Sequence, residues 1–214
     1  MTPRERLASA RLYLVCDARP RAWLAAALRG GVDIIQLRDR SLSDTGLVTA
    51  AEEFRAAADE AGALFILNDR PDLVEACRAD GVHVGQDDTP PAEARAAVGE
   101  DRIVGRSTHA PPQADAAQAD PDVDYVVIGP VHETPTKPGR PATGLAYVGY
   151  AAQSVTKPWF AIGGLDEHTL AAAIEAGARR AVVVRAIAGA DDPEAAARTL
   201  HTLLEEAPDG AARA

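Results

Sequence analysis

The chain has 214 residues, enough for one large domain, and 47% of them are hydrophobic, a share that argues against disorder and allows a full core. Aromatic residues make up only 4%, which favours alanine-rich helices on an aliphatic sheet over a β-sandwich. The net charge of −10 argues against nucleic acid or an anionic membrane as a main partner, although a local cluster of arginine and lysine can still bind an anionic substrate.

The cysteines and the N-terminus indicate a compartment. Cys16 and Cys77 lie in apolar surroundings without another cysteine or histidine at metal-ligand spacing, so they are expected to be reduced core thiols. The first ten residues are charged and lack a hydrophobic signal core, and no apolar run reaches the length of about 18 residues that crosses a membrane. We therefore expect a cytoplasmic protein without a membrane segment.

Apolar runs alternate with helical segments along the whole chain. The expected strands are residues 12–16, 33–37, 63–67, 81–84, 102–105, 123–128, 159–162 and 180–184. The expected helices are residues 21–29, 44–61, 71–78, 89–98, 111–119, 144–154, 166–177 and 192–205, with a short one at 186–189.

This alternation predicts the fold class. Strands that are almost entirely apolar and separated by helices indicate a parallel sheet covered on both faces. Eight such units close most simply into a single (β/α)8 barrel, a TIM barrel. The alternative is an open doubly wound sheet, but no Gly-x-Gly-x-x-Gly follows the first strand. We expect one domain over residues 1–205 and a disordered tail over 206–214, and a homodimer stays open as an alternative to a monomer.

Polar residues follow most of these strands, at the end where barrels of this type hold their active sites. In chain order they are Gln36-Leu37-Arg38-Asp39-Arg40, Asn68-Asp69-Arg70, Gly85-Gln86-Asp87-Asp88, Arg106-Ser107-Thr108-His109, the stretch from Gly129 to Pro141, Gly163-Gly164 and Arg185-Ala186-Ile187. Their common position at one rim is the signal, since none of them is specific alone.

The first of these clusters suits a phosphate or diphosphate. Gln36, Arg38 and Arg40 alternate, so at an extended strand end they are expected to point to the same side. Planar guanidinium groups bind two oxygens of such an anion at once. The alternative is a solvated strand end with salt bridges to Asp39.

Two carboxylates end neighbouring strands. Asp69 and Asp88, with Asn68 alongside, can hold Mg²⁺, a hard cation that prefers oxygen ligands, water and substrate phosphates. The alternative is that these acids cap the helices that follow them.

The connection after the sixth strand is longer than the others. Between Gly129 and Pro141 it carries Thr134, Thr136, Lys137 and Arg140 among several prolines. Long connections in compact domains are usually lids or disordered segments, so the alternatives are a semi-rigid loop that binds anions and a surface excursion.

A second phosphate site is expected between Gly163-Gly164 and the short helix after the eighth strand, because glycines let backbone amides approach a ligand. The histidines give a weaker signal. His83 is expected to be structural, whereas His109 and His132 lie near the rim and could touch substrate. The sequence has no evident Ser/His/Asp arrangement and no His/Cys zinc spacing.

A metal site, a diphosphate clamp and a second phosphate site without a nucleophile fit a transferase from which diphosphate leaves. As a set, the motifs resemble the thiamine-phosphate synthase (thiamine-phosphate pyrophosphorylase) family over residues 12–188. The matching stretches are Gln36-Leu37-Arg38-Asp39-Arg40, Asn68-Asp69, Gly85-Gln86-Asp87-Asp88, Gly129-Pro130 with Thr134-Pro135-Thr136-Lys137, and Ile162-Gly163-Gly164.

The resemblance implies a reaction and a division of roles. An aminopyrimidine carrying a diphosphooxymethyl group loses diphosphate to form a pyrimidine cation, which the nitrogen of a thiazole-ethyl phosphate attacks to give thiamine monophosphate; a carboxylated thiazole also loses CO₂. Arg38, Ser107 and Lys137 are implied as catalytic, and Asp69 and Asp88 as ligands of one Mg²⁺ per site. The implied substrate-binding residues are Gln36, Leu37, Arg38, Asp39, Arg40, Asn68, Ser107, Thr134, Pro135, Thr136, Lys137, Gly164, Val184 and Arg185.

Two positions depart from the family pattern. Arg40 stands where lysine is common, which puts the geometry of the diphosphate contact in doubt. Arg185 stands where serine is frequent, so we expect a backbone contact there and leave the role of its side chain open. Two other functions stay open: a thiazole tautomerase of the same superfamily, and a non-catalytic phosphate-binding barrel.

Overall fold

The computed structural model describes residues 1–134 and 141–207. Its strands are β1 (Leu12–Cys16), β2 (Ile34–Leu37), β3 (Leu64–Asn68), β4 (Gly81–Val84), β5 (Ile103–Thr108), β6 (Tyr125–Ile128), β7 (Trp159–Ile162) and β8 (Ala181–Val183). Its helices are α1 (Pro3–Ser9), α2 (Arg21–Arg29), α3 (Asp44–Ala61), the 3₁₀ helix η1 (Pro71–Leu73), α4 (Pro91–Val98), α5 (Pro111–Ala119), α6 (Gly144–Ser154), α7 (Leu170–Glu175), α8 (Arg185–Ala188) and α9 (Pro193–Glu205).

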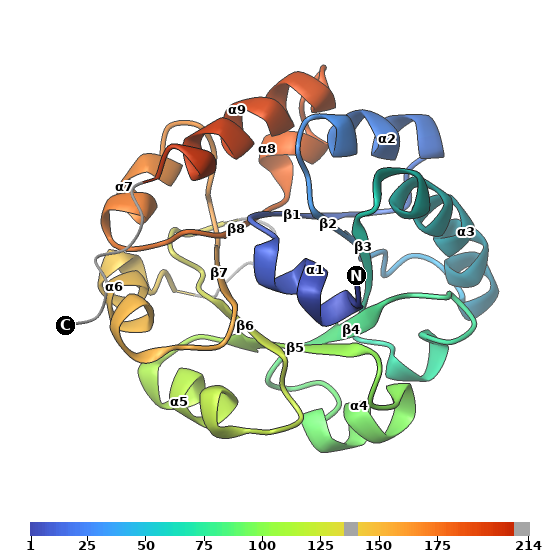
Figure 1. The fold of residues 1–214 in the computed structure, drawn as a ribbon, viewed down its shortest axis with the longest axis horizontal. Helices are drawn as coiled ribbons and strands as arrows, with labels where there is room; N and C mark the ends of the chain where they lie inside the picture. Colours follow the sequence, from blue (N-terminus) through green and yellow to red (C-terminus); the bar gives the residue numbers. More distant parts are fainter. Residues whose placement is uncertain (135–140, 208–214) are drawn as a thin grey trace.

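The strands form a closed parallel barrel in chain order, and the helices after β1 surround it as an outer ring (Figure 1). Closure is direct, because β8 pairs with β1 through Leu12 and Ala181, Tyr13 and Val182, and Leu14 and Val183. The (β/α)8 prediction is confirmed, and the open doubly wound alternative is excluded. No helix in residues 1–134 and 141–207 is long and apolar enough to cross a membrane.

Alternation along the strands separates two cores. Residues that face the barrel axis form one cluster, which includes Tyr13, Ile34, Leu64, Tyr125 and Phe160. Their neighbours in sequence pack outward against the helices, and Cys16 and Cys77 belong to this outer cluster. Both thiols are free and buried, as expected. Polar residues on the inward faces toward the strand C-termini therefore open into the barrel mouth.

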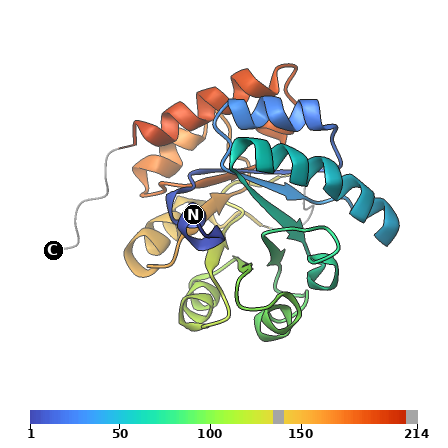
Figure 2. The same ribbon diagram turned by 45° about the vertical axis from the view of Figure 1, so that its right-hand side comes forward.

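The opposite mouth is covered by α1, a helix that the sequence analysis missed (Figures 1 and 2). Thr2 and Glu5 form a capping box at its start, and Leu7 is buried in the inner cluster. Arg4 Nε donates to Asp124 Oδ1 at 2.7 Å, and Arg6 Nη2 donates to Asp80 Oδ1 at 3.1 Å. The N-terminal segment is thus a plug that closes the bottom of the barrel.

Carboxylates fix the ends of three strand pairs at the bottom. Asp33, Asp80 and Asp124 each stand immediately before an even-numbered strand. Their Oδ2 atoms accept from the amides of Leu12, Phe65 and Val104 in the preceding odd-numbered strands, at 2.9, 2.8 and 2.8 Å. The guanidinium groups of Arg55 and Arg95 complete two of these sites.

Some predicted boundaries were wrong for local reasons. β5 continues to Thr108 because Ser107 and Thr108 pair with Val127 and Ile128, so polar residues assigned to a loop belong to the strand. The helix expected over 71–78 is a 3₁₀ turn ending at Leu73, and the helix expected from Asp166 begins at Leu170. In the second case Asp166 Oδ1 accepts from the amides of His168 and Thr169, which stabilises a turn before the helix.

Candidate active site at the barrel mouth

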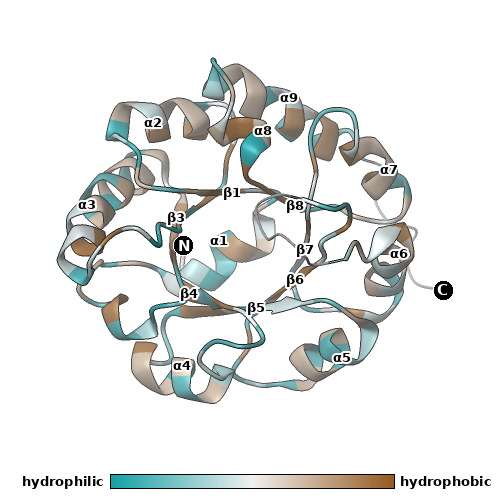
Figure 3. Ribbon diagram, turned by 180° about the vertical axis from the view of Figure 1, so that it is seen from behind, coloured by the Kyte–Doolittle hydropathy of each residue, from teal (hydrophilic) through white to brown (hydrophobic). Residues whose placement is uncertain are grey.

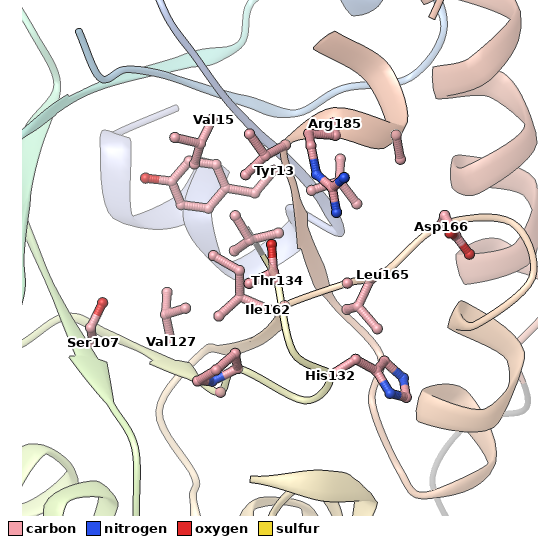
Figure 4. Close-up of a pocket in the computed structure, with 18 of the residues that line it drawn as sticks. Tyr13, Val15, Ser107, Val127, His132, Thr134, Ile162, Leu165, Asp166 and Arg185 are labelled. Atoms are coloured by element: carbon pink, nitrogen blue, oxygen red, sulfur yellow. The ribbon is translucent and has the colours of Figure 1, made fainter. Parts of the chain in front are cut away.

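A cavity of about 620 Å³ opens at the C-terminal ends of the strands (Figure 4). Polar lining residues come from β1, β2, β3, β4 and β5 and from the connections after β6, β7 and β8. Figure 4 shows Ser107 and Arg185 at opposite sides of the cavity, with Thr134 and Ile162 between them in this view. The residues that the sequence analysis assigned to the site and that line this cavity are Gln36, Arg38, Asn68, Ser107, Thr134, Gly164, Val184 and Arg185.

Other assigned residues lie elsewhere. The Leu37 side chain is buried in the outer core, and Asp39 accepts from the amide and hydroxyl of Ser41 at 3.0 and 2.6 Å. Arg40 is exposed and does not line the cavity, but its Nη2 lies 3.4 Å from Asp69 Oδ2 at the same rim. The expectation that it points to the same side as Gln36 and Arg38 stays a prediction. Pro135, Thr136 and Lys137, with Arg140, lie outside the described residues.

Arg38 is the central cation of the described site. Burial, and then the neighbouring charge of Arg40, lowers the pKa of its guanidinium, while Asp69 and Asp88 oppose that change. A guanidinium keeps its charge in spite of such a shift. Arg38 and Arg40 are therefore held close together beside Asp69 and Asp88, and an anionic ligand would relieve the repulsion between the two cations.

Asp69 and Asp88 lie together at the ends of neighbouring strands. Burial, and then the charge of Asp88, raises the pKa of Asp69. The Asp69 amide donates to His83 O at 2.9 Å, and Asp88 Oδ2 accepts from the Gly85 amide at 2.9 Å. Neither η1 nor α4 has a side-chain cap, so helix capping does not account for these two acids.

The acidic pair has the chemistry of a magnesium site. Mutual repulsion between the half-buried Asp69 carboxylate and the exposed Asp88 carboxylate is what a divalent cation would remove. The described residues contain no group of three His, Cys, Asp or Glu side chains that could hold a metal. A cation between Asp69 and Asp88 would therefore take further ligands from water and substrate oxygens, as Mg²⁺ commonly does.

The floor of the cavity is a chain of polar side chains that the sequence analysis did not connect. Gln36 Nε2 donates to the Tyr13 hydroxyl, which lies 3.0 Å from the Tyr125 hydroxyl. Tyr125 Oη lies 3.0 Å from His83 Nδ1, and His83 Nε2 lies 2.8 Å from Ser107 Oγ. His83 is buried, as its structural assignment implied, but it also lines the cavity.

The upper wall joins the connections after β6 and β7. The Val131 and His132 amides donate to Ile162 O and Gly163 O at 2.8 and 3.0 Å. Gly164 has φ +64, and a Cβ there would lie 2.8 Å from His132 Cβ. This close approach holds His132 and Thr134 at the cavity, and His109 lies nearby with its Nδ1 2.6 Å from Gly129 O.

The far side of the cavity is formed by the start of α8. Val184 precedes this helix, and Arg185 is its first residue. The first amides of a helix have no intrahelical acceptor, so those of Arg185 and Ala186 can donate to a ligand. Figure 4 shows the exposed Arg185 guanidinium extending toward the cavity.

Comparisons with known proteins agree with this geometry. Residues 12–187 match the family described as thiamine monophosphate synthase. The chain is 52% identical over 209 residues to a thiamine-phosphate synthase of Thermobifida fusca, covering 95% of this chain and 96% of the relative. It is 51% identical over 207 residues to one of Acidothermus cellulolyticus, covering 94% and 98%. A solved thiamine phosphate pyrophosphorylase from Pyrococcus furiosus superposes with a TM-score of 0.86 at 28% identity, covering 96% of this chain and 99% of that one.

Proposed function

Because the chain belongs to the thiamine monophosphate synthase family and is a transferase of that family, we propose that its barrel mouth joins two phosphorylated small molecules. One is 4-amino-2-methyl-5-(diphosphooxymethyl)pyrimidine, and the other is a thiazole-ethyl phosphate, with or without a carboxyl group. The products are thiamine monophosphate and diphosphate, together with CO₂ when the thiazole carries the carboxyl group.

The pyrimidine is assigned to the deep part of the cavity. Gln36 and Ser107 present amide and hydroxyl groups there, and Asn68 lies beside them at the end of β3. The diphosphate would extend toward Arg38 and Arg40, and Lys137, which lies outside the described residues, is assigned to the same anion. Support for this orientation comes from the lowered pKa of Arg38, because a cation crowded by burial and Arg40 gains most from an anionic partner.

Asp69 and Asp88 would hold a metal ion in this metal-assisted family, and their carboxylate oxygens are ligands that suit Mg²⁺. The ion would offset negative charge on the diphosphate as it leaves. Arg40 supports this arrangement, because its Nη2 lies 3.4 Å from Asp69 Oδ2 and can turn toward the same anion.

The chemistry needs charge stabilisation more than a nucleophile. The bond between the methylene carbon and the diphosphate oxygen breaks, and its electron pair leaves with the diphosphate. The electron-rich aminopyrimidine disperses the cation until the thiazole nitrogen forms the new carbon–nitrogen bond with its lone pair. Arg38 and Lys137 stabilise the leaving charge, Ser107 holds the ring, and the apolar wall of Val15, Val127 and Ile162 limits attack by water.

The thiazole phosphate is assigned to the opposite wall. Thr134, Pro135 and Thr136 are assigned to this phosphate, and backbone amides of Gly164 and Arg185 would also bind it. The positive φ of Gly164 supports this, because a bare backbone there allows close approach of an anion. Val184 would form the apolar edge under the ring.

The paired acids beside the arginines distinguish this proposal from the alternatives. A thiazole tautomerase has no use for a diphosphate and metal site, and a phosphate sensor needs no metal at all. The test is an assay of purified protein with both substrates, with and without Mg²⁺, following diphosphate and thiamine phosphate together. Equal, metal-dependent formation of both supports the synthase; thiazole isomerisation without diphosphate release, or binding without turnover, would overturn it.

A further inference from the structure

The polar chain under the cavity links two side chains that the proposed function places against the pyrimidine. Gln36, Tyr13, Tyr125, His83 and Ser107 follow one another from β2 through β1, β6 and β4 to β5. All five are less than 9% exposed, and Tyr13 and Tyr125 are fully buried. Gly105 makes room for the chain, since a Cβ there would overlap the Tyr125 ring. Bulk water therefore does not compete for the links between the tyrosines.

Each hydroxyl in this chain carries one proton, so the direction of one link determines the next. When Gln36 donates to Tyr13, the Tyr13 hydroxyl donates to Tyr125, and the Tyr125 hydroxyl donates to His83 Nδ1. His83 is then the tautomer protonated at Nε2 and donates to Ser107 Oγ. The Ser107 hydroxyl can consequently donate its proton to a group in the cavity.

Burial supports this account, because it raises the pKa of both Tyr13 and Tyr125 above the ordinary tyrosine value. Both hydroxyls stay protonated at neutral pH, so each passes on the direction of its hydrogen bond and carries no charge. The opposite direction is the other complete arrangement: Gln36 presents its carbonyl to Tyr13, and Ser107 donates to His83. A mixed arrangement leaves two buried donors or two acceptors facing each other, which is unfavourable.

We propose that this chain acts as one unit that sets which hydrogen-bonding groups Gln36 and Ser107 present to the pyrimidine, and thereby selects an amino over an oxo group on the ring. The proposal rests on the proposed function, which places the ring against these two residues. Tyr13, Tyr125 and His83 are positioning residues, because they act through Gln36 and Ser107.

The selection follows from what each end presents. With one N–H given to Tyr13, Gln36 keeps its carbonyl oxygen and one N–H for the ligand, which match an amino donor beside a ring-nitrogen acceptor. An oxo ring has the reverse edge, with an N–H beside a carbonyl. If the Gln36 amide rotated by 180° to match the oxo ring, the chain would reverse. Ser107 would then donate to His83 and could no longer donate to a second ring nitrogen. The wrong ring thus loses hydrogen bonds at both ends.

Cutting the chain tests the coupling. Tyr125→Phe removes the central hydroxyl, so the Gln36 half can reverse without the Ser107 half. The probes are the 4-amino and 4-oxo forms of 2-methyl-5-(phosphooxymethyl)pyrimidine, whose Kd values are measured by calorimetry. We expect the preference for the amino form to fall about tenfold, the size of one hydrogen bond to a correctly oriented partner. A preference within about twofold of the wild-type value would overturn the inference, since a single hydrogen bond is worth more than that.

Matched variants distinguish a loss of coupling along the chain from a general loss of structure. Tyr147→Phe also removes a buried hydroxyl, one that bonds to Thr108 and Ala110 away from the chain, and should leave the preference unchanged. If Tyr125→Phe does not fold, as judged by circular dichroism, Tyr13→Phe breaks the same chain and is expected to give the same loss of preference.

Two further variants separate this inference from the proposed function. Gln36→Ala and Ser107→Ala should each weaken binding of the amino form. If neither does, the pyrimidine is placed wrongly and both proposals fail. If both do while Tyr125→Phe and Tyr13→Phe keep the wild-type preference, the coupling alone is overturned.

Discussion

Arg40 Nη2 lies 3.4 Å from Asp69 Oδ2, so a residue assigned to the diphosphate directly contacts one assigned to the metal. Asp69 is itself crowded, because burial and then Asp88 raise its pKa. Arg40 and the partner carboxylate therefore act on Asp69 in opposite directions. The acid pair and the two arginines form one electrostatic unit. A substitution in either should change the binding of both the substrate and the metal.

Replacing Asp88 tests the metal assignment. Asp88→Asn keeps an acceptor for the Gly85 amide but removes the charge, and we expect the rate of thiamine phosphate formation to fall about 100-fold or more, because metal and charge stabilisation are worth several kcal/mol. Asp87→Asn removes an adjacent exposed carboxylate and should retain nearly the full rate. An unchanged rate for Asp88→Asn at limiting Mg²⁺ would remove Asp88 from the metal site.

The thiazole phosphate site can be tested by separating backbone from side chain. Gly164→Ala places a Cβ at φ +64 and 2.8 Å from His132 Cβ, and we expect KM for the thiazole phosphate to rise about tenfold or more. Arg185→Ala removes an exposed charge and should raise that KM about fivefold or less. The KM for the pyrimidine diphosphate serves as an internal control. A larger effect from Arg185→Ala would show that its side chain, and not the backbone, carries the contact.

The buried thiols give a prediction with a defined pH dependence. Burial, and then the nearby charge of Asp17, raises the pKa of Cys16 from 9.0 to about 12, and burial also raises the pKa of Cys77. The stabilising contribution of each neutral thiol is complete below pH 9 and is lost as the pH rises toward the folded-state pKa. At pH 8 a disulfide reagent should modify neither cysteine in the native protein and both in guanidinium. Rapid native labelling would contradict the burial of these side chains.

The barrel bottom offers a matched pair of stability variants. Asp80→Ala leaves the Arg55 guanidinium, whose side chain is 8% exposed, without its buried carboxylate and frees the Phe65 amide. We expect a loss of about 3–5 kcal/mol in the free energy of unfolding, measured by denaturant titration. Asp59→Ala removes the other partner of Arg55, which is 65% exposed, and should cost less than about 1 kcal/mol. Similar losses for both variants would argue against a special role of the buried pair.

The sequence predicts the barrel because its strong signal is local: eight apolar runs separated by helices. It also predicts the rim, because polar residues at strand ends share one mouth once the strands are parallel. It does not predict the chain under the cavity. Tyr13 and Tyr125 look like ordinary core residues, and only closure of the barrel brings their hydroxyls within 3.0 Å across the interior.

The weakest predictions concern short or irregular segments. Strand alternation cannot place Arg40, because β2 ends at Leu37 and Arg40 lies beyond it. The helix α1 was missed although Thr2 and Glu5 form a capping box, because seven residues give too short a periodic signal. Its position is determined by Arg4 and Arg6, whose partners lie far away in sequence.

The aspartates before β2, β4 and β6 each bind the preceding strand and so join the barrel strands in pairs. The fourth pair, β7 and β8, has no such aspartate. Arg180 stands before β8, and its guanidinium donates to the carbonyls of Ala8 and Ala10 at the end of α1. The N-terminal helix thus connects the bottom ends of β4, β6 and β8 through Arg6, Arg4 and the Ala8 carbonyl. Removal of residues 1–9 should accelerate amide hydrogen exchange in these three strands together, and less in β2, whose Asp33 accepts from the amides of Arg11 and Leu12 beyond the removed residues.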